Sequence, residues 1–213
     1  MALIAEDLAV ERGGRLALAA PDFRIEAGEA ALVAGPNGAG KSTLLRALAG
    51  LSPLKRGRVM FEGAADVAAH VAYAGHLDAV KPALSVRANL RAWAAIYRSG
   101  GDVDDALARL GLAHIADEPA AFCSAGQKRR LGLARLLVAG RRIWLLDEPT
   151  VSLDAASVAA LSERIAAHCR AGGIAVVATH VEFGLPKGPR IELTAPEVGA
   201  DAVGDPFLAG AWA

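Results

Sequence analysis

The feature that most constrains this chain is a glycine-rich segment, GPNGAGKST, at residues 35–43. It follows a short apolar run at residues 30–34 and opens a stretch that we expect to be helical from about Ser42 to Ala49. Glycines let the backbone curl until successive N–H groups point at one phosphate, and the helix that follows contributes its positive end. The segment therefore predicts a strand, a phosphate-binding loop and a helix, in that order. The residues assigned to phosphate binding are Gly35, Pro36, Asn37, Gly38, Ala39, Gly40, Lys41, Ser42 and Thr43.

Two acidic residues complete the predicted chemistry. In the pattern Gly-x-x-x-x-Gly-Lys-Ser/Thr, Lys41 reaches the β- and γ-phosphates of a nucleotide and the Ser42 hydroxyl is a ligand of Mg²⁺. An apolar strand predicted at residues 143–146 ends in Asp147, which would hold the same Mg²⁺ mostly through water. Glu148 would orient and deprotonate the attacking water. An acidic pair at a strand end is common by itself, but downstream of a phosphate-binding loop it predicts nucleotide hydrolysis.

The order of the predicted elements indicates an α/β fold. Continuous apolar strands alternate with helical patterns, which is typical of a parallel sheet covered on both faces. We expect further strands at residues 3–10, 15–25, 58–61, 70–74 and 174–178, and helices at residues 125–139 and 155–170. The first two strands are separated by a turn at Gly13 and Gly14.

The sequence pattern in the middle of the chain predicts helices. We expect helices at residues 85–98, capped by Ser85, and at residues 103–110, behind Asp102. Leu90, Trp93, Ala94 and Tyr97 recur at helical spacing and are expected to pack a helical core. The chain is thus predicted to be a single domain, 1–213, with a core at about 1–76 and 136–195, a helical subdomain at about 77–135 and an irregular tail at about 195–213.

Composition narrows the class of partner. There are 23 basic and 23 acidic residues, so the formal net charge is zero, whereas nucleic-acid binders usually carry a basic excess or stripe. Hydrophobic residues make up 54% of the chain, yet no unbroken apolar stretch reaches the ~18 residues that a membrane span needs. Two cysteines, Cys123 and Cys169, cannot build a disulfide framework. The N-terminus lacks the basic and apolar regions of a signal peptide, so we expect a reducing compartment.

A third motif carries a family resemblance. The segment Cys123-Ser124-Ala125-Gly126-Gln127 opens the predicted helix at residues 125–139. It resembles the Leu-Ser-Gly-Gly-Gln signature of the nucleotide-binding subunits of ATP-binding cassette (ABC) transporters, with Cys for Leu and Ala for the first Gly. Asp154 matches that family's D-loop and His180 its switch histidine. The resemblance implies the P-loop NTPase fold of an ABC ATPase: an N-terminal antiparallel β region, a mostly parallel sheet and an inserted helical subdomain.

The resemblance also implies a mechanism. Members of the family bind two ATP molecules between two copies, head to tail, so that the signature of one copy meets the nucleotide held by the other. Ser124, Gly126, Gln127 and Asp154 would then contact the nucleotide across the dimer, and His180 would contact the γ-phosphate. The implied activity is Mg²⁺-dependent ATP hydrolysis that drives integral membrane subunits, at the cytoplasmic face of a bacterial inner membrane.

Several positions depart from the family pattern. His76, in Tyr73-Ala74-Gly75-His76, stands where the family has a glutamine that contacts Mg²⁺ and the attacking water, and we expect it to replace that glutamine. No aromatic residue near the first turn is available to stack on adenine, and Arg12 could stack its guanidinium instead. Both cysteines are expected to be small buried side chains. Lys128–Arg130 is expected to be a solvated helix face.

With these departures, the chain resembles one subfamily, the ATP-binding subunit of the cytochrome c biogenesis complex, often called the haem exporter. The segment from Gly75 to Leu90 carries most of this resemblance, through Lys81-Pro82, Leu84-Ser85-Val86 and Asn89. Haem would be cargo of the partner subunits rather than a ligand of this chain. Alternatives are an ABC exporter ATPase for another substrate, a soluble ABC protein that acts on ribosomes or DNA, and a small-molecule kinase, which would leave Ser124–Gln127 unexplained.

Overall fold

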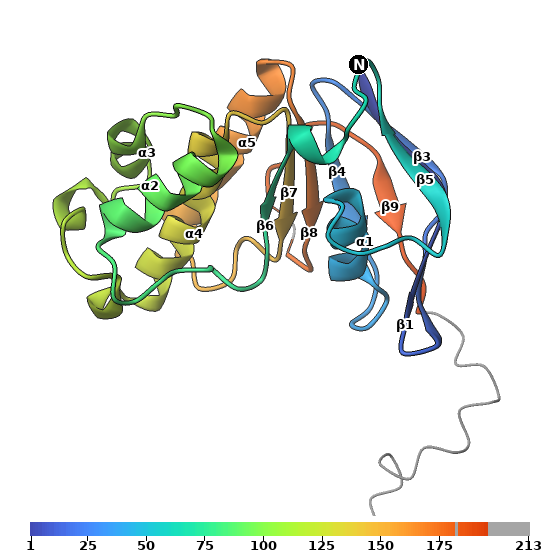
Figure 1. Ribbon diagram of the computed structural model, residues 1–213, viewed down its shortest axis with the longest axis horizontal. Helices are drawn as coiled ribbons and strands as arrows, with labels where there is room; N and C mark the ends of the chain where they lie inside the picture. Colours follow the sequence, from blue (N-terminus) through green and yellow to red (C-terminus); the bar gives the residue numbers. More distant parts are fainter. Residues whose placement is uncertain (182, 196–213) are drawn as a thin grey trace, which may run out of the picture.

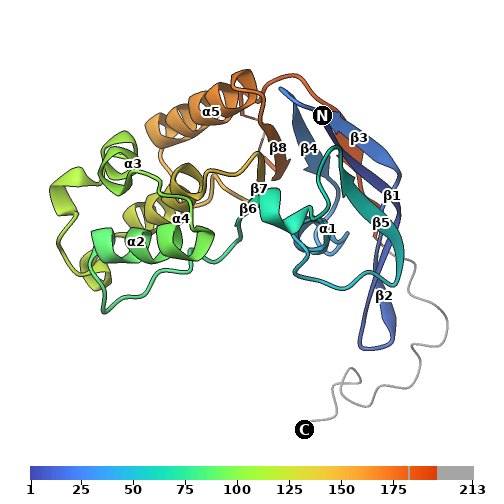
Figure 2. The ribbon, with the colours of Figure 1, turned by 45° about the horizontal axis from the view of Figure 1, so that its top comes forward.

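The computed structural model describes residues 1–181 and 183–195. Three groups of elements lie side by side: an antiparallel sheet, a parallel sheet and a group of helices (Figure 1). The group of helices stands at the opposite end of the molecule from the antiparallel sheet, and the parallel sheet lies between the two, while one further helix, at residues 41–48, lies beside the antiparallel sheet (Figure 2). The tail predicted from about residue 195 lies almost wholly outside the described residues.

The antiparallel sheet is built around one long strand, β1 (Ala2–Arg12). The turn at Gly13 and Gly14 has φ of 56° and 74°, a left-handed conformation that glycine adopts without steric cost. The strand predicted at residues 15–25 is in fact two, because Pro21 lies between them and has no N–H for the ladder. These are β2 (Arg15–Ala19) and β3 (Phe23–Glu26), and β5 (Arg56–Phe61) also pairs with β1.

The parallel sheet has the order β6-β7-β8-β4-β9. Its predicted strands are confirmed, while the short strand β9 was not predicted because three residues, Arg-Ile-Glu, give no apolar run. Side chains alternate between faces: Ile143 and Leu145 enter one core, Trp144 and Leu146 the other. The five strands are β4 (Ala30–Ala34), β6 (Val71–Ala74), β7 (Ile143–Asp147), β8 (Ile174–Ala178) and β9 (Arg190–Glu192).

Helices cover both faces of this sheet, which explains why its central strands are apolar throughout. On one face α1 (Lys41–Leu48) shares a core with the antiparallel sheet, in which Leu44 and Leu45 are fully buried. The other face is covered by α4 (Ala125–Ala139) and α5 (Ala155–Arg170). None of the helices in the described ranges combines the length and the apolar character needed to cross a membrane.

The helical group consists of α2 (Val86–Tyr97) and α3 (Val103–Arg109) packed on α4. Both predicted caps are confirmed: Ser85 Oγ accepts a hydrogen bond from the Ala88 N–H at 3.1 Å, and the Asp102 carboxylate accepts from the first turn of α3. These helices surround a core of their own, with Leu90 fully buried. Its α4 members are Leu131, Ala134 and Val138, whereas Leu133, Leu136 and Ala139 of the same helix face the sheet.

The two aromatic residues of α2 both pack inward, but only Trp93 packs against the helical core as predicted. Trp93 packs against the core of the helical group, and the Arg135 guanidinium lies 5.1 Å from its ring centre. Tyr97 packs against the core beneath the sheet, with the Arg141 guanidinium 5.6 Å from its ring centre. Each ring therefore has a cation partner within the chain, in the distance range of a cation–π interaction.

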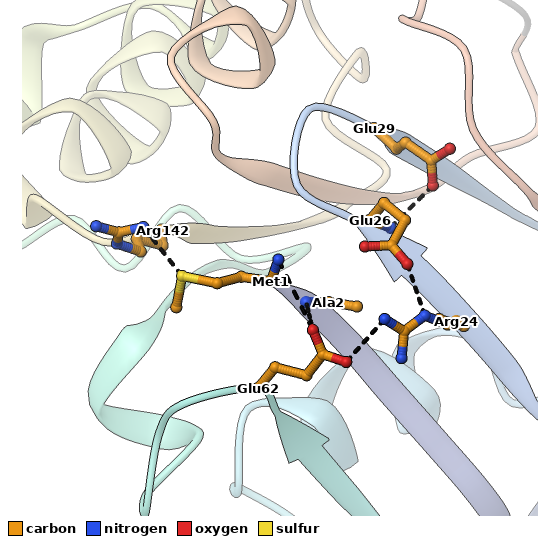
Figure 3. A network of polar contacts seen from close by, with 7 residues as sticks. All are labelled: Met1, Ala2, Arg24, Glu26, Glu29, Glu62 and Arg142. Carbon is orange, nitrogen blue, oxygen red and sulfur yellow. Dashed lines mark hydrogen bonds and ion pairs between the residues drawn. The ribbon is translucent and has the colours of Figure 1, made fainter.

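A polar network fastens the start of β1 to its neighbours (Figure 3). The Glu62 carboxylate accepts hydrogen bonds from Arg24 Nη2 at 2.7 Å and from the Ala2 N–H at 3.1 Å. The Arg24 guanidinium holds the pKa of Glu62 below its ordinary value. The resulting stabilisation is present above the unfolded-state pKa and is lost as pH falls through the folded-state pKa. Arg142, just before β7, donates to Met1 Sδ at 3.4 Å, which links this network to the parallel sheet.

The core of the helical group can be tested by truncating one buried side chain. We expect Leu90→Ala to lower the free energy of unfolding by about 2–5 kcal/mol, because the cavity it leaves cannot be refilled fully. Ile96→Ala on the same helix is the control: its side chain is 66% exposed, so the loss should stay within about 0.5 kcal/mol. Urea unfolding measures both, and equal losses would contradict the packing of α2.

Candidate functional site

The glycine-rich segment forms a tight loop between β4 and α1. Gly35, Gly38 and Gly40 have φ of 143°, 83° and 96°, a region that other residues rarely adopt. A Cβ at Gly35 would overlap the Leu193 carbonyl oxygen, while one at Gly40 would stand 3.0 Å from the Ala17 carbonyl oxygen. The predicted order of strand, loop and helix is thus confirmed, and the loop needs glycine for space as well as for conformation.

Lys41 folds back over this loop. Its Nζ donates hydrogen bonds to the carbonyl oxygens of Gly35, at 2.8 Å, and Pro36, at 3.1 Å, and lies 2.9 Å from His180 Nε2. The side chain is buried. The ammonium group is therefore already held beside the loop, where it would meet a phosphate.

The two predicted Mg²⁺ ligands lie in contact. Asp147, at the end of β7, is buried, and its Oδ1 accepts a hydrogen bond from Ser42 Oγ at 3.0 Å. The other carboxylate oxygen, Oδ2, accepts from the Tyr73 hydroxyl at 3.3 Å. Burial, and then the charge of Asp147, raises the pKa of Tyr73, so the phenol stays a donor at neutral pH. Two oxygens from two elements suit Mg²⁺, which takes few protein ligands beside phosphates and water.

Glu148 and His180 extend the site from the ends of β7 and β8. The Glu148 backbone is left-handed, with φ of 45°, and its N–H donates to the Ala178 carbonyl at 2.8 Å. His180 Nε2 lies 3.6 Å from Glu148 Oε1 and 2.8 Å from Asn37 Oδ1. One imidazole therefore touches the loop, its lysine and the predicted base.

These side chains line one open cavity of about 500 Å³. That volume lies in the usual range for small-molecule sites. Leu16 and Ala17, on β2, form part of its wall and were not singled out from the sequence. The predicted residues that it gathers are Arg12, Asn37, Gly38, Gly40, Lys41, Ser42, Thr43, Asp147, Glu148 and His180. Gly35, Pro36 and Ala39 belong to the same loop but are not among the residues that line the cavity.

Arg12, which was predicted to stack its guanidinium on adenine, lies at the wall of the cavity beyond the loop. Its Nη2 donates a hydrogen bond to Ser52 Oγ at 3.4 Å, so the guanidinium is fixed at the rim of the cavity. Leu16 is 44% exposed and also lines the cavity, which makes it a second candidate for apolar contact with the adenine ring of a nucleotide. The alternation of the hairpin strand was the only signal that could have indicated Leu16.

The signature residues stand apart from the cavity lining. Ser124 caps α4 and exchanges two hydrogen bonds with Gln127: its Oγ accepts from the Gln127 N–H at 3.2 Å, and Gln127 Oε1 accepts from the Ser124 N–H at 2.8 Å. A Cβ at Gly126 would stand 3.0 Å from the Ser152 carbonyl oxygen, so this glycine lets the helix start approach the segment after Glu148. The end of α4 that begins at Ser124 is exposed.

Asp154 and His76 also lie outside the cavity lining. Asp154 caps α5: its Oδ1 accepts a hydrogen bond from the Ser157 N–H at 2.7 Å, and that bond lowers the pKa of the Asp154 carboxyl. His76 is exposed on the loop that follows β6. The predicted roles of both residues therefore stay predictions.

The structure contradicts the prediction made for the basic run after the signature. Lys128–Arg130 was expected to be a solvated helix face, but Arg129 is only 4% exposed. Its guanidinium donates to backbone carbonyls directly after β7 and on the loop after β6. The cysteines behave as predicted: Cys123 and Cys169 are both buried.

Comparison with known proteins decides the family. The family model described as ABC transporter matches residues 18–151, which include the loop, the signature and the acidic pair. The chain belongs to the ABC transporter family. Within this family it is 53% identical to the cytochrome c biogenesis ATP-binding export protein CcmA of Paracoccus denitrificans, over 90% of this chain and 88% of that one. It is also 53% identical to CcmA of Rhodobacter capsulatus, over 91% and 88% of the two chains.

Solved structures of the ABC family share the fold. The ATP-binding subunit of an ABC transporter matches with a TM-score of 0.74 and 25% identity, over 85% of this chain and 80% of that one. An ABC transporter ATP-binding protein from Pyrococcus furiosus matches with a TM-score of 0.78, over 91% and 98% of the two chains. Its 23% identity shows the fold alone. The predicted P-loop NTPase fold with an antiparallel region, a parallel sheet and inserted helices is thereby confirmed.

The need for glycine in this ABC protein's loop can be measured with two matched variants. Gly35→Ala and Gly38→Ala both place a side chain at positive φ, but only at Gly35 does the new Cβ overlap a carbonyl oxygen. We expect Gly35→Ala to weaken ATP binding at least about tenfold more than Gly38→Ala, since a displaced loop loses several phosphate hydrogen bonds. Fluorescent-nucleotide titration measures the affinities, and equal losses would show that the contact with Leu193 is unimportant.

Proposed function

We propose that this ABC protein is the Mg²⁺-dependent ATP-hydrolysing subunit of the membrane complex that handles haem in cytochrome c biogenesis. One observation carries the chemistry: Lys41, the contacting pair Ser42 and Asp147, and Glu148 all line a single cavity. The identity of 53% to proteins named CcmA supports the biological setting. An ABC ATPase serving another exported substrate is the alternative outcome of the experiments below.

The geometry suggests how each residue would act on ATP. The loop N–H groups and Lys41 would bind the β- and γ-phosphates, the lysine exchanging its carbonyl partners for phosphate oxygens. Ser42 would ligate Mg²⁺ directly and Asp147 mostly through water. Bound Mg²⁺ supplies positive charge that neutralises the phosphates. Glu148 would orient and deprotonate the attacking water, and His180 would contact the γ-phosphate as charge develops on it.

A second copy of the chain would complete the site. Ser124, Gly126 and Gln127 lie at an exposed helix start outside the cavity lining, so they are available to a nucleotide held by another molecule. A helix start offers unpaired N–H groups and a positive dipole end, which favour a phosphate. We infer a head-to-tail dimer around two ATP molecules, with Asp154 on the segment between the copies.

Integral membrane subunits are the remaining partners. Large apolar side chains are exposed along the helical group and the loop before it: Leu77 is 79%, Ile96 66% and Phe122 81% exposed. Exposed apolar side chains of this size are available for contact with another protein. The chain would therefore sit as a peripheral subunit at the cytoplasmic face of a bacterial inner membrane, with haem carried by its partners.

Removing the predicted base tests the catalytic assignment. We expect Glu148→Gln to bind ATP with near wild-type affinity but to lower the rate constant of hydrolysis at least about 10²-fold, because the amide cannot take a proton from water. The variant should also accumulate as a dimer when Mg²⁺ and ATP are present, which light scattering measures. Normal turnover by this variant would remove Glu148 from the base role.

Two further residue assignments are tested by titration with ATP, which measures affinity, and by an assay of released phosphate, which measures turnover. Lys41→Ala should weaken ATP binding about 10- to 100-fold, which corresponds to the loss of one or two charged hydrogen bonds. Lys187→Ala is the control: this lysine is exposed, so ATP binding should not change.

His76→Ala should lower turnover with ATP affinity unchanged if His76 replaces the usual glutamine. A chelator of Mg²⁺ should stop hydrolysis in the wild-type protein.

The membrane setting has its own test. We expect the affinity-tagged protein, extracted from membranes in mild detergent, to carry integral membrane proteins of cytochrome c biogenesis, identified by mass spectrometry. Replacing Leu77 and Phe122 by Ser should reduce the recovered partners while ATP binding in solution is retained, because both side chains are exposed and lie outside the cavity. Recovery of another transporter's subunits would favour the alternative substrate.

A further inference from the structure

Arg129 is a buried cation that connects three parts of the molecule. It lies on α4, two residues after Gln127, and 4% of its surface is exposed. A lone buried charge is costly unless hydrogen bonds and an opposite charge compensate it. Here all three guanidinium nitrogens donate, and their acceptors come from the end of β7 and the loop that follows β6.

One side of the guanidinium holds the backbone around the predicted base. Arg129 Nη2 donates to the carbonyl oxygens of Asp147, at 3.0 Å, and Glu148, at 2.7 Å, and Nε donates to that of Pro149, at 3.3 Å. Glu148 has φ of 45°, a left-handed conformation that costs free energy for a residue with a side chain. Two hydrogen bonds stabilise this conformation: the one from Arg129 Nη2 to the Glu148 carbonyl oxygen and the one from the Glu148 N–H to the Ala178 carbonyl oxygen.

The other side of the guanidinium holds the loop that carries His76. Arg129 Nη1 donates to the carbonyl oxygens of Gly75, at 3.0 Å, and His76, at 3.3 Å, and pairs with Asp78 Oδ1 at 2.9 Å. The loop lies close against the helix, since a Cβ at Gly132 would stand 3.0 Å from the Asp78 backbone. A single side chain thus ties α4 both to this loop and to the acidic segment.

We propose that Arg129 is a positioning residue for ATP hydrolysis. It fixes the backbone of Glu148 so that the carboxylate faces the nucleotide cavity, and it makes that position depend on α4 and on the loop at residues 75–78. A displacement of the signature end of α4 reaches Glu148 through this guanidinium. The inference rests on the proposed function, because it assigns Arg129 a role in the reaction that Glu148 performs there.

The first experiment compares Arg129→Met with Arg130→Met in the full-length protein. Both remove a guanidinium from neighbouring positions of α4, but within the described part of the chain Arg130 hydrogen-bonds to the Leu110 carbonyl, at 3.0 Å in the helical group, and not to the backbone at Glu148 or at the loop after β6. We expect Arg129→Met to lower kcat on the order of 10²-fold with the KM for ATP nearly unchanged, as misplacement of a catalytic group does. Arg130→Met should keep wild-type kcat. Equal kcat in Arg129→Met and wild type overturns the inference.

A double variant separates positioning from general loosening of the fold. If Arg129 acts through Glu148, then Arg129→Met combined with Glu148→Gln should hydrolyse ATP no more slowly than Glu148→Gln alone. Multiplying losses would show that Arg129 acts elsewhere and would overturn the inference. Wild-type turnover and its loss in Glu148→Gln test the proposed function separately, so the two ideas can fail independently.

A conservative variant covers the case in which Arg129→Met does not fold. Lysine keeps the charge and can pair with Asp78, but its single ammonium lacks the fork that spans both sides. We expect Arg129→Lys to unfold near the wild-type urea midpoint while its kcat stays at least tenfold low. Restoration of wild-type kcat by lysine would show that a charge alone suffices, and would overturn the bridging role.

Discussion

The structure depends on one geometric constraint: parallel strands bring their carboxyl ends to the same edge of the sheet. The loop with Lys41 leaves the end of β4, Asp147 and Glu148 leave β7, and His180 leaves β8. Residues more than 130 positions apart thereby come within hydrogen-bond distance, as Lys41 and His180 do at 2.9 Å. Within one copy of the chain, each predicted catalytic residue follows directly on the strand that brings it to this edge.

This edge can face a ligand only because the two faces of the sheet are occupied. The antiparallel sheet and α1 cover one face, and α4 and α5 cover the other. The antiparallel sheet also supplies Leu16 and Ala17 to the cavity, so the element that closes the core forms part of the binding wall. The helical group adds a third core and places the signature at an exposed helix start, away from the cavity of its own chain.

Local sequence patterns predicted most of the fold, because loops, helix caps and apolar strands each depend on residues that are adjacent in the sequence. The phosphate loop, the acidic pair and the helix caps at Ser85 and Asp102 are of this kind. What could not be predicted depends on distant partners: β9 exists because β4 offers it an edge, and Tyr73 reaches Asp147 across neighbouring strands. The prediction that Arg129 faces solvent was wrong, although a basic run normally does so. The five carbonyl oxygens that accept its hydrogen bonds belong to residues far away in the sequence, so the residues next to Arg129 do not indicate them.

The division of α4 between two cores has a thermodynamic consequence. Leu131 and Ala134 pack into the helical group, whereas Leu133 and Leu136 pack against the sheet, so neither group can lose its structure without baring part of the other's interior. Separate domains joined by a linker would melt in steps, but elements that share a helix stabilise each other and melt together. We therefore expect the sheet and the helical group to unfold as one cooperative unit, because a continuous helix rather than a flexible linker connects them.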